Sequence, residues 1–292
     1  MHILKASELI IKPKNRIYHL NIAPNELANN VILVGDPQRV TKISRYFDHI
    51  TVRRHNREFV THTGNIGKTN ITVISTGIGA ANIDIVMNEL DALANINFVT
   101  RQANKTLKSL NIIRIGTSGA LQEDIPLNSI LISKTAINLT GLLKHYNYTE
   151  TETNKKFKDK LSKHIAYEKL TNDISVFSGN EKLINIFNTE CIFGITATCN
   201  GFYAPQNRYL RTKPKFPNLI DKLVSFDYNK QKITNLEMET AAIYGLGDIL
   251  GHKCCSLNAI IANRARGTFT TQLNKLLKSL ISLTLDGITS YG

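Results

Sequence analysis

Residues 31–39 read VILVGDPQR: an apolar, β-branched run stops at a glycine and continues into a turn that ends with an arginine. A short apolar run bounded by turn residues is typical of a buried β-strand. The chain repeats this pattern at residues 71–75, 111–115, 129–133, 192–198 and 256–262. The repetition predicts a sheet whose strands are spread over most of the chain.

Helical patterns lie between several of these strands. Apolar residues recur at threes and fours over residues 83–93, and a clearer stripe from Leu273 to Ile281 weakens at Thr284. Thr234 and Glu237 have the spacing of a capping box, which predicts that another helix begins near residue 234. Strands that alternate with helices predict an α/β fold.

A length of 292 residues allows one large domain or two small ones. The sequence has no internal repeat and no low-complexity linker. Two polar stretches, residues 144–160 and 205–231, have the character of surface excursions. We therefore expect a single domain that spans residues 1–292.

Composition restricts the class of protein. Hydrophobic residues make up 42% of the chain, and no stretch approaches the roughly 20 apolar residues of a membrane span. The start of the chain lacks the layout of a signal peptide. The four cysteines show no CxxC spacing, and Cys254 and Cys255 are adjacent, which argues against a disulfide framework or a zinc site. These features predict a reduced, cytoplasmic enzyme without a metal.

The net charge of +13 is the unusual bulk feature, and it is compatible with nucleic acid, an acidic membrane surface or a small anionic substrate. Nucleic-acid binding requires a clustered basic face with interleaved aromatic residues. The lysines are instead scattered along the chain. We expect no nucleic-acid partner and no membrane partner.

Two strand ends carry groups that suit an anion. Gly35 allows close approach to the backbone, and Arg39 offers a bidentate fork, although an ordinary turn with a surface arginine would look the same. Residues 114–119 read RIGTSG, with Arg114 inside an apolar strand and Thr117 in a glycine-rich turn. A buried arginine requires an anion or an ion pair, so a structural ion pair is the alternative. Neither turn matches a Walker A loop or a dinucleotide fingerprint.

The order and spacing of GDPxR, STGIG and RIGTSG resemble the nucleoside phosphorylase-I (purine/uridine phosphorylase) family, and the resemblance extends from Tyr18 to Arg264. It implies a three-layer α/β/α fold with a central mixed, partly barrel-like sheet flanked by helices. It also implies that phosphate is a co-substrate, that no organic cofactor is needed, and that phosphate is bound by the following residues: Gly35, Arg39, Arg114, Thr117 and Arg57 of a neighbouring subunit.

Residues 202–208, FYAPQNR, are similar to the FYxxQxR signature of the uridine branch of this family. Gln206 can donate to and accept from the adjacent edges of uracil, and Arg208 can stabilise a carbonyl oxygen that gains charge. Phe202 offers a flat face to the ring or the sugar. Purine enzymes of the family place an aspartate where this chain has Asn263, and the uridine branch uses the following arginine, Arg264, for the far carbonyl.

Residues 237–239 are similar to the family's ribose-binding EME motif. The resemblance assigns the ribose hydroxyls to Glu239, packing on the sugar to Met238, and a neighbouring position to Glu237, which also has the alternative role of a helix cap. His19 resembles the histidine that reaches a neighbouring subunit's ribose, as Arg57 reaches its phosphate. The resemblance therefore implies a dimer or a hexamer.

In some bacterial relatives a potassium ion binds at the dimer interface, partly through the glutamate that matches Glu58. The serine that assists there is Asn82 in this chain, which argues against the ion. We expect no metal.

Together these motifs predict uridine phosphorylase activity: phosphate-dependent cleavage of uridine to uracil and ribose 1-phosphate, in nucleoside salvage. A purine or broad-specificity nucleoside phosphorylase is the alternative within the family. A hydrolytic nucleosidase, and a non-catalytic protein that binds nucleosides or nucleic acid, are more distant alternatives. The sequence leaves the preference between uridine and deoxyuridine or thymidine open.

Overall fold

The structure is a computed structural model that describes residues 3–171, 173–187 and 191–291. Its strands belong to one large sheet and two small hairpins. They are β1 (Ile11–Lys12), β2 (Arg16–Ile17), β3 (Asn30–Val34), β4 (His49–Asn56), β5 (Phe59–Ile66), β6 (Thr69–Ser75), β7 (Ile96–Asn97), β8 (Gln102–Ala103), β9 (Asn111–Ala120), β10 (Ile130–Leu139), β11 (Ser175–Ser178), β12 (Ile192–Cys199), β13 (Asp227–Tyr228), β14 (Gln231–Glu237), β15 (Lys253–Asn263) and β16 (Thr268–Phe269).

The helices are placed between the strands along the chain. The α-helices are α1 (Pro37–Ser44), α2 (Ala80–Asn95), α3 (Glu152–Ile165), α4 (Glu168–Thr171), α5 (Glu181–Asn185), α6 (Leu219–Ser225), α7 (Thr240–Leu250) and α8 (Leu273–Tyr291). The short 3-10 helices are η1 (Pro24–Glu26), η2 (Leu142–His145) and η3 (Ala204–Gln206). No described helix combines the length and the apolar character of a membrane span.

The main sheet is mixed and partly closed into a barrel. Within the described residues it has twelve strands, in the order β13-β14-β12-β10-β15-β9-β3-β6-β5-β4, with β11 and β16 at its margins. Strand β9 is parallel to both β3 and β15, whereas β10 is antiparallel to β15. Strand β14 also pairs with β9, so β9, β15, β10, β12 and β14 form a closed ring. The combination of mixed sheet and barrel that the family resemblance implied is confirmed.

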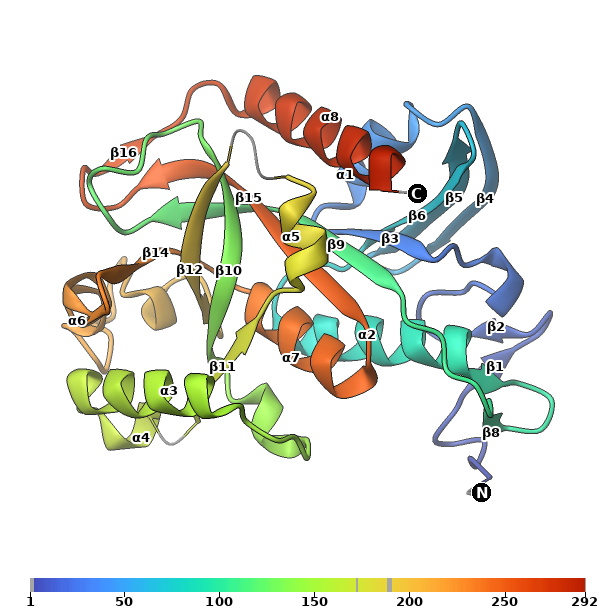
Figure 1. Cartoon of the computed structure of the whole chain (residues 1–292), viewed down its shortest axis with the longest axis horizontal. Helices are drawn as coiled ribbons and strands as arrows, with labels where there is room; N and C mark the ends of the chain where they lie inside the picture. The colour runs from blue at the N-terminus through green and yellow to red at the C-terminus, as the bar shows by residue number, and fades with distance from the viewer. Residues whose placement is uncertain (1–2, 172, 188–190, 292) are drawn as a thin grey trace.

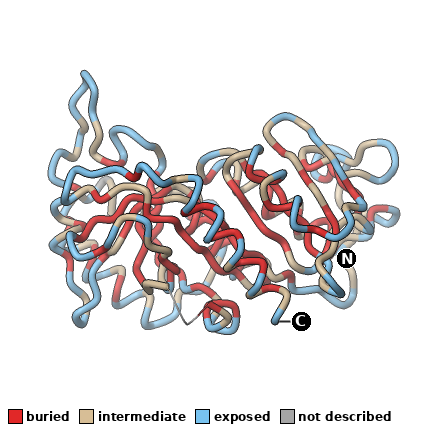
Figure 2. The backbone as a smooth tube through the Cα atoms, turned by 90° about the horizontal axis from the view of Figure 1, so that it is seen from above, coloured by how far each residue is buried: buried red, intermediate tan, exposed pale blue. Residues whose placement is uncertain are grey.

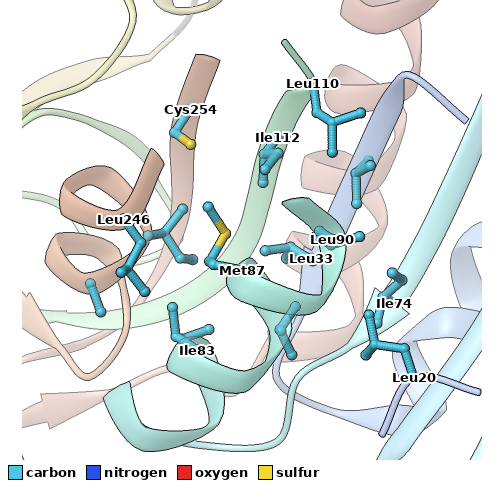
Figure 3. Close-up of a cluster of buried hydrophobic side chains, with 14 of the residues drawn as sticks. Leu20, Leu33, Ile74, Ile83, Met87, Leu90, Leu110, Ile112, Leu246 and Cys254 are labelled. Carbon is cyan, nitrogen blue, oxygen red and sulfur yellow. The ribbon is translucent and has the colours of Figure 1, made fainter. Parts of the chain in front are cut away.

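Side chains alternate between the two faces of the sheet and give it two apolar surfaces. On β3, Val31 and Leu33 belong to one buried cluster, while Ile32 and Val34 belong to the other. Helices α2 and α7 cover the first face, and Figure 3 shows Met87 of α2 among Ile112, Leu246 and Cys254. Helices α1, α5 and α8 cover the second face. In Figure 1, α8 lies above the sheet and α2 with α7 below it, which is the predicted three-layer arrangement.

A third buried cluster fills the space between the barrel strands and the two polar stretches. The expectation that residues 144–160 and 205–231 are mere surface excursions was wrong. Phe157 of α3 and Leu223 of α6 are buried in this cluster, because each helix turns one apolar stripe towards the barrel. In Figure 2 the buried backbone lies along the middle of the molecule, while the exposed segments are mainly outer loops.

The helix expected to begin near residue 234 does not begin there. Thr234 lies inside β14, which pairs in parallel with β12, and α7 begins only at Thr240. Glu237 nevertheless caps this later helix, since its carboxylate accepts hydrogen bonds from the backbone N–H groups of Glu239 and Thr240 at 2.8 to 3.1 Å. Glu237 therefore caps a helix, but not as the partner of Thr234, because the helix that it caps begins six residues after Thr234.

Candidate active site

A cavity of about 970 Å³ opens where the main strands end. Strands β3, β6, β9 and β15 run parallel, so their carboxyl ends meet at the same edge of the sheet. The segments that follow β12 and β14 complete the wall. The location agrees with the general rule that ligands bind in α/β proteins outside the carboxyl ends of the strands.

The cavity brings together all of the predicted site residues except two. Those that line it are Gly35, Arg39, Arg114, Thr117, Phe202, Gln206, Arg208, Glu237, Met238, Glu239 and Arg264. His19 and Arg57 lie outside it. Segments from both halves of the chain are therefore needed to build this one site.

Arg39 is a buried cation without a carboxylate partner among the described residues. It lies in α1, directly after the turn at Gly35, and its side chain is only 8% exposed. Nη1 donates to the carbonyl oxygen of Ile115 at 3.0 Å, whereas Nε has no partner. Burial and the neighbouring Arg114 lower the pKa of Arg39. The position is not that of a surface arginine, and it favours an anion.

The turn that carries Gly35 leaves little room for a side chain. A Cβ at this position would lie 3.3 Å from the carbonyl oxygen of Gly77, which follows β6. Gly77 has a φ of +71°, which strains a residue with a side chain, and a Cβ there would also displace Asn82, whose Nδ2 lies 2.3 Å from its position. The two strand ends thus approach each other closely and leave their backbones open to the cavity.

Arg114 is buried and held by three side chains. Nη1 donates to Oδ1 of Asn258 at 2.8 Å, and Nη2 lies 2.5 Å from Oε2 of Glu239 and 3.0 Å from Oε2 of Glu237. Burial lowers the pKa of Arg114, but the two carboxylates outweigh it and raise the pKa. A Cβ on Gly116 would lie 1.8 Å from Nη1, so this glycine makes room for the guanidinium. The ion pair that the sequence left as the alternative is present, and Arg114 also lines the cavity; its binding of an anion stays a prediction.

The carboxylate of Glu239 lies between Arg114 and the turn after β6. Its Oε1 accepts a hydrogen bond from the backbone N–H of Gly79 at 2.7 Å. Burial raises the pKa of Glu239, and Arg114 opposes this rise. Met238, between the two glutamates, is half-buried and lines the cavity. The EME segment therefore presents acceptor oxygens and one apolar side chain to the same space.

The segment around η3 forms a second cationic region. Arg208 lies over the ring of Phe202, with 4.1 Å between its Cζ and the ring centroid, and it donates to Oε1 of Gln206. Arg264, which follows β15, donates to the backbone carbonyl of Gln206. Burial and the neighbouring Arg264 lower the pKa of Arg208 to about 10. Because Oε1 of Gln206 already accepts from an arginine, its Nε2 is left to donate to a ligand.

Asn263 lines the cavity wall, but its amide is committed to the protein. Nδ2 donates to the carbonyl oxygens of Gln122 and Ile125 at 3.0 and 2.9 Å, and Oδ1 accepts from the backbone N–H of Arg266. An aspartate could not make the two donated bonds in its ionised form. The side chain at this position is therefore built into the fold.

His19 and Arg57 lie near each other, away from the cavity of their own chain. Asn56 donates to the carbonyl oxygen of His19 at 2.8 Å, and the guanidinium of Arg57 lies 5.9 Å from the ring centroid of Tyr18. Nδ1 of His19 is 2.7 Å from the carboxylate of Glu89 and must donate to it, which leaves Nε2 to a further partner.

Several lining residues were not identified from the sequence as parts of a binding site. They include Ile78, Ser118, Gly267, Thr268 and Phe269. Ser118 was within the quoted RIGTSG motif and could have been selected. The β15–β16 hairpin has no comparable motif, and Phe269 is 64% exposed. Among the described residues no group of histidine, cysteine, aspartate and glutamate could hold a metal ion.

Comparisons with known proteins identify similar phosphorylases. The uridine phosphorylase of Thermococcus kodakarensis is 32% identical over 252 residues, which cover 86% of this chain and 79% of that protein. The uridine phosphorylase of Treponema pallidum is 29% identical over 249 residues, covering 85% and 83%. A solved structure of a Trypanosoma brucei nucleoside phosphorylase, described as showing uridine phosphorylase activity, superposes with a TM-score of 0.89 at 28% identity and covers 97% and 99% of the two chains.

The model of one protein family, the phosphorylase superfamily, matches residues 30–285. This range contains the main sheet and every predicted residue that lines the cavity. The chain belongs to the phosphorylase superfamily.

Proposed function

We propose that this chain is a uridine phosphorylase, which cleaves uridine with inorganic phosphate to uracil and ribose 1-phosphate in nucleoside salvage. The observation that carries the proposal is that one cavity is lined by two separate arginine pairs, Arg39 with Arg114 and Arg208 with Arg264. The similar uridine phosphorylases support the same activity.

Phosphate binds at the first arginine pair. The unpartnered Nε of Arg39 and the open backbone at Gly35 offer donors to its oxygens, and Thr117 adds a hydroxyl. Arg114 is held in place by its carboxylates, so it adds positive charge without needing to reorganise. The bound dianion is thereby aligned with C1′ of the ribose.

Uracil binds at the second pair. Nε2 of Gln206 donates to a carbonyl oxygen of the base, while Arg208 and Arg264 meet the negative charge that develops as the glycosidic bond breaks. Phe202 carries Arg208 on its ring and packs on the ligand. The ribose lies between the two pairs, with Glu239 accepting from its hydroxyls and with Glu237 and Met238 beside it.

No cofactor takes part in these steps, and we propose that no cation binds at Glu58. Nδ2 of Asn82 donates to Oε1 of Glu58 at 3.2 Å and to the carbonyl oxygen of Thr76 at 2.9 Å. The side-chain amide of Asn82 therefore already donates to the two oxygens that a cation at this place would need. Within the described part of the chain one sheet carries the cavity, and we propose that residues 1–292 form one functional unit. We also propose that the protein acts in the cytoplasm, where thiols such as those of the adjacent Cys254 and Cys255 stay reduced.

We further propose that the active unit is at least a dimer. His19 and Arg57 are neighbours, yet neither lines the cavity of its own chain. Arg57 is exposed, and Nε2 of His19 is available to accept a hydrogen bond from a hydroxyl group. A second copy related by two-fold symmetry would receive Arg57 at its phosphate and His19 at its ribose. A hexamer made of such dimers would use the same contact.

The direct test is release of free base from uridine, thymidine and inosine in parallel, with and without phosphate. We expect rapid release from uridine that depends on phosphate. Thymidine turnover would show how strictly the enzyme requires a 2′-hydroxyl. Cleavage of inosine but not uridine would overturn the assignment, and cleavage of uridine that ignores phosphate would indicate a hydrolase.

The Arg208→Ala variant tests the base site. We expect loss of most uridine turnover with an unchanged melting temperature, because Arg208 is half-buried and contacts the ligand cavity. Arg211→Ala is the matched control, since this exposed arginine lies three residues further on and outside the cavity. Wild-type activity in Arg208→Ala would refute the base-site assignment.

Mixing of two inactive variants tests the shared site. Arg57→Ala damages the neighbour's site, and Arg208→Ala damages its own, so a hybrid dimer contains one site without either change. After subunit exchange, an equal mixture should recover about a quarter of the wild-type activity, given two-fold symmetry. Activity that remains at the level of the separate variants would show that Arg57 acts within its own chain or not at all.

A further inference from the structure

Asn258 is a buried polar side chain in an otherwise apolar stretch of β15, and the register of the strands decides what it contacts. Strand β15 runs parallel to β9, and the pairing puts Asn258 opposite Gly116. Side chains two residues apart on a strand share a face, so Arg114 and Gly116 lie on the same face of β9. Because Gly116 has no side chain, the guanidinium of Arg114 lies over it, and Nη1 reaches Oδ1 of Asn258 at 2.8 Å.

The side-chain amide of Asn258 can take only one orientation. A guanidinium only donates, so the amide atom that faces it must be the oxygen. The amide nitrogen then donates to two serine hydroxyls, Oγ of Ser133 at 3.2 Å and Oγ of Ser256 at 3.3 Å. Each serine is in turn hydrogen-bonded to a threonine, Ser133 to Thr196 and Ser256 to Thr240. All of these side chains are fully buried, so the fold itself fixes the position of the amide oxygen.

Asn258 does not line the cavity, whereas Arg114 does. Any effect of Asn258 on a ligand therefore passes through Arg114. Nη2 of Arg114 is held by Glu237 and Glu239, and Nη1 is held by Asn258. Two anchors on different nitrogens fix the plane of a guanidinium, so its remaining N–H groups keep one direction and need not reorganise when a ligand binds.

The absence of charge on Asn258 matters as much as its position. Arg114 already faces two carboxylates, those of Glu237 and Glu239. An aspartate at position 258 would also accept from Nη1, but it would add a further negative charge behind the place where an anion binds. Buried like charges repel strongly because little water screens them. An amide oxygen fixes the guanidinium without this repulsion.

We propose that Asn258 is a positioning residue for phosphate, whose neutral amide oxygen fixes the guanidinium of Arg114 and adds no negative charge beside the anion. The proposal rests on the proposed function, which assigns inorganic phosphate to the cavity wall at Arg39 and Arg114. Uracil is assigned to the other arginine pair, Arg208 with Arg264. A change at Asn258 therefore weakens the binding of phosphate and leaves that of uracil unchanged.

Two variants separate the position of the acceptor from its charge. Asn258→Ala removes the acceptor, whereas Asn258→Asp keeps an acceptor of the same shape and adds a charge. Calorimetry gives the Kd of phosphate and, separately, of uracil, and initial rates give KM for phosphate. We expect phosphate to bind roughly tenfold more weakly to Asn258→Ala, the size of one lost hydrogen bond. For Asn258→Asp we expect a loss on the order of a hundredfold, because of the added repulsion. Both variants should bind uracil as the wild type does.

A merely structural role for Asn258 predicts a different pattern. Aspartate resembles asparagine in shape, so Asn258→Asp would then disturb the protein less than Asn258→Ala. A general loss of packing would also weaken the binding of uracil together with that of phosphate. Either result would overturn the proposal, as would wild-type affinity for phosphate in both variants.

Asn138→Ala is the matched control. Asn138 is another fully buried asparagine of the main sheet, but its hydrogen bonds go to Ser175 and Thr140, and it does not line the cavity. This variant should have a lower melting temperature and an unchanged Kd for phosphate. A loss of phosphate affinity equal to that of Asn258→Ala would overturn the proposal. A wild-type protein that binds uracil but not phosphate would instead contradict the proposed function, so the two failures are distinguishable.

Discussion

Arg39 provides a strong test of phosphorolysis, because its side chain is unfavourable for the folded protein unless an anion binds. The guanidinium is buried, makes one hydrogen bond to a backbone carbonyl, leaves Nε without a partner and lies near the second cation, Arg114. Replacement by methionine retains much of the length and removes the charge. The Arg39→Met variant should therefore affect stability and activity in different directions.

The expected magnitudes follow from these contacts. In the ligand-free protein the substitution removes a desolvated charge and a repulsion at the expense of one hydrogen bond, so the free energy of unfolding should stay within about 1 kcal/mol or increase. With phosphate, the variant loses charge-assisted hydrogen bonds of about 1.5–3 kcal/mol each. Two such bonds correspond to a decrease in kcat/KM for phosphate of roughly 10²- to 10⁴-fold.

Two measurements test this expectation. Initial rates of uracil release against phosphate concentration give kcat/KM, and thermal melts with and without phosphate give the stabilisation by the bound anion. Phosphate at a hundred times its Kd should stabilise the wild type by about 2.7 kcal/mol and the variant much less. Arg45→Met is the control, because Arg45 is an exposed arginine at the end of the same helix. A variant with wild-type phosphate kinetics and an undiminished melting shift would refute the assignment of Arg39 to phosphate.

Three further substitutions test other parts of the site. Asn263→Asp removes two donated hydrogen bonds and should lower the free energy of unfolding by about 2–4 kcal/mol, measured by urea unfolding; an unchanged midpoint would contradict this. Gly116→Ala places a Cβ 1.8 Å from Nη1 of Arg114, so it should reduce phosphate-dependent turnover at least tenfold, and normal kinetics would show that the guanidinium moves without cost. Because burial raises the pKa of Glu239 above the ordinary value of a glutamate, activity should fall as the pH decreases and this carboxylate becomes protonated; that fall should disappear in Glu239→Gln, and its persistence there would argue against this residue.

Much of the fold could be predicted because most of its strands are short apolar runs bounded by turn residues, a pattern visible in the local sequence. The run at residues 31–34 is apolar on both faces, as a strand between two helical layers must be, and the structure places it there. The failure at Thr234 shows the limit. A capping box is a signal over four residues, whereas β14 is held by pairing with β12 and β9, which are remote in sequence. Tertiary pairing overrode the local signal.

The lining of the candidate site could be predicted where one short motif supplies several groups, as around Gln206 and Arg208. It could not be predicted where a role depends on contacts across the sheet. Asn258 looks like a polar interruption of an apolar strand until its contact with Arg114 is known. Phe269 has no signal of its own, because its position follows from the path of the β15–β16 hairpin.

Two buried arginines in the cavity differ in their ion pairs, and this difference favours phosphorolysis over hydrolysis. Arg114 is neutralised by Glu237 and Glu239, so by itself it is compatible with an enzyme that binds only a neutral nucleoside and water. Arg39 makes no such ion pair among the described residues: Asp36 and Glu239 raise its pKa, but burial and Arg114 outweigh them and lower it, so the charge is costly to the ligand-free fold. A hydrolase would gain nothing from this cost, since water carries no charge. A phosphorylase gains from it at every turnover, because a cation without an ion-pair partner strengthens the binding of a dianion.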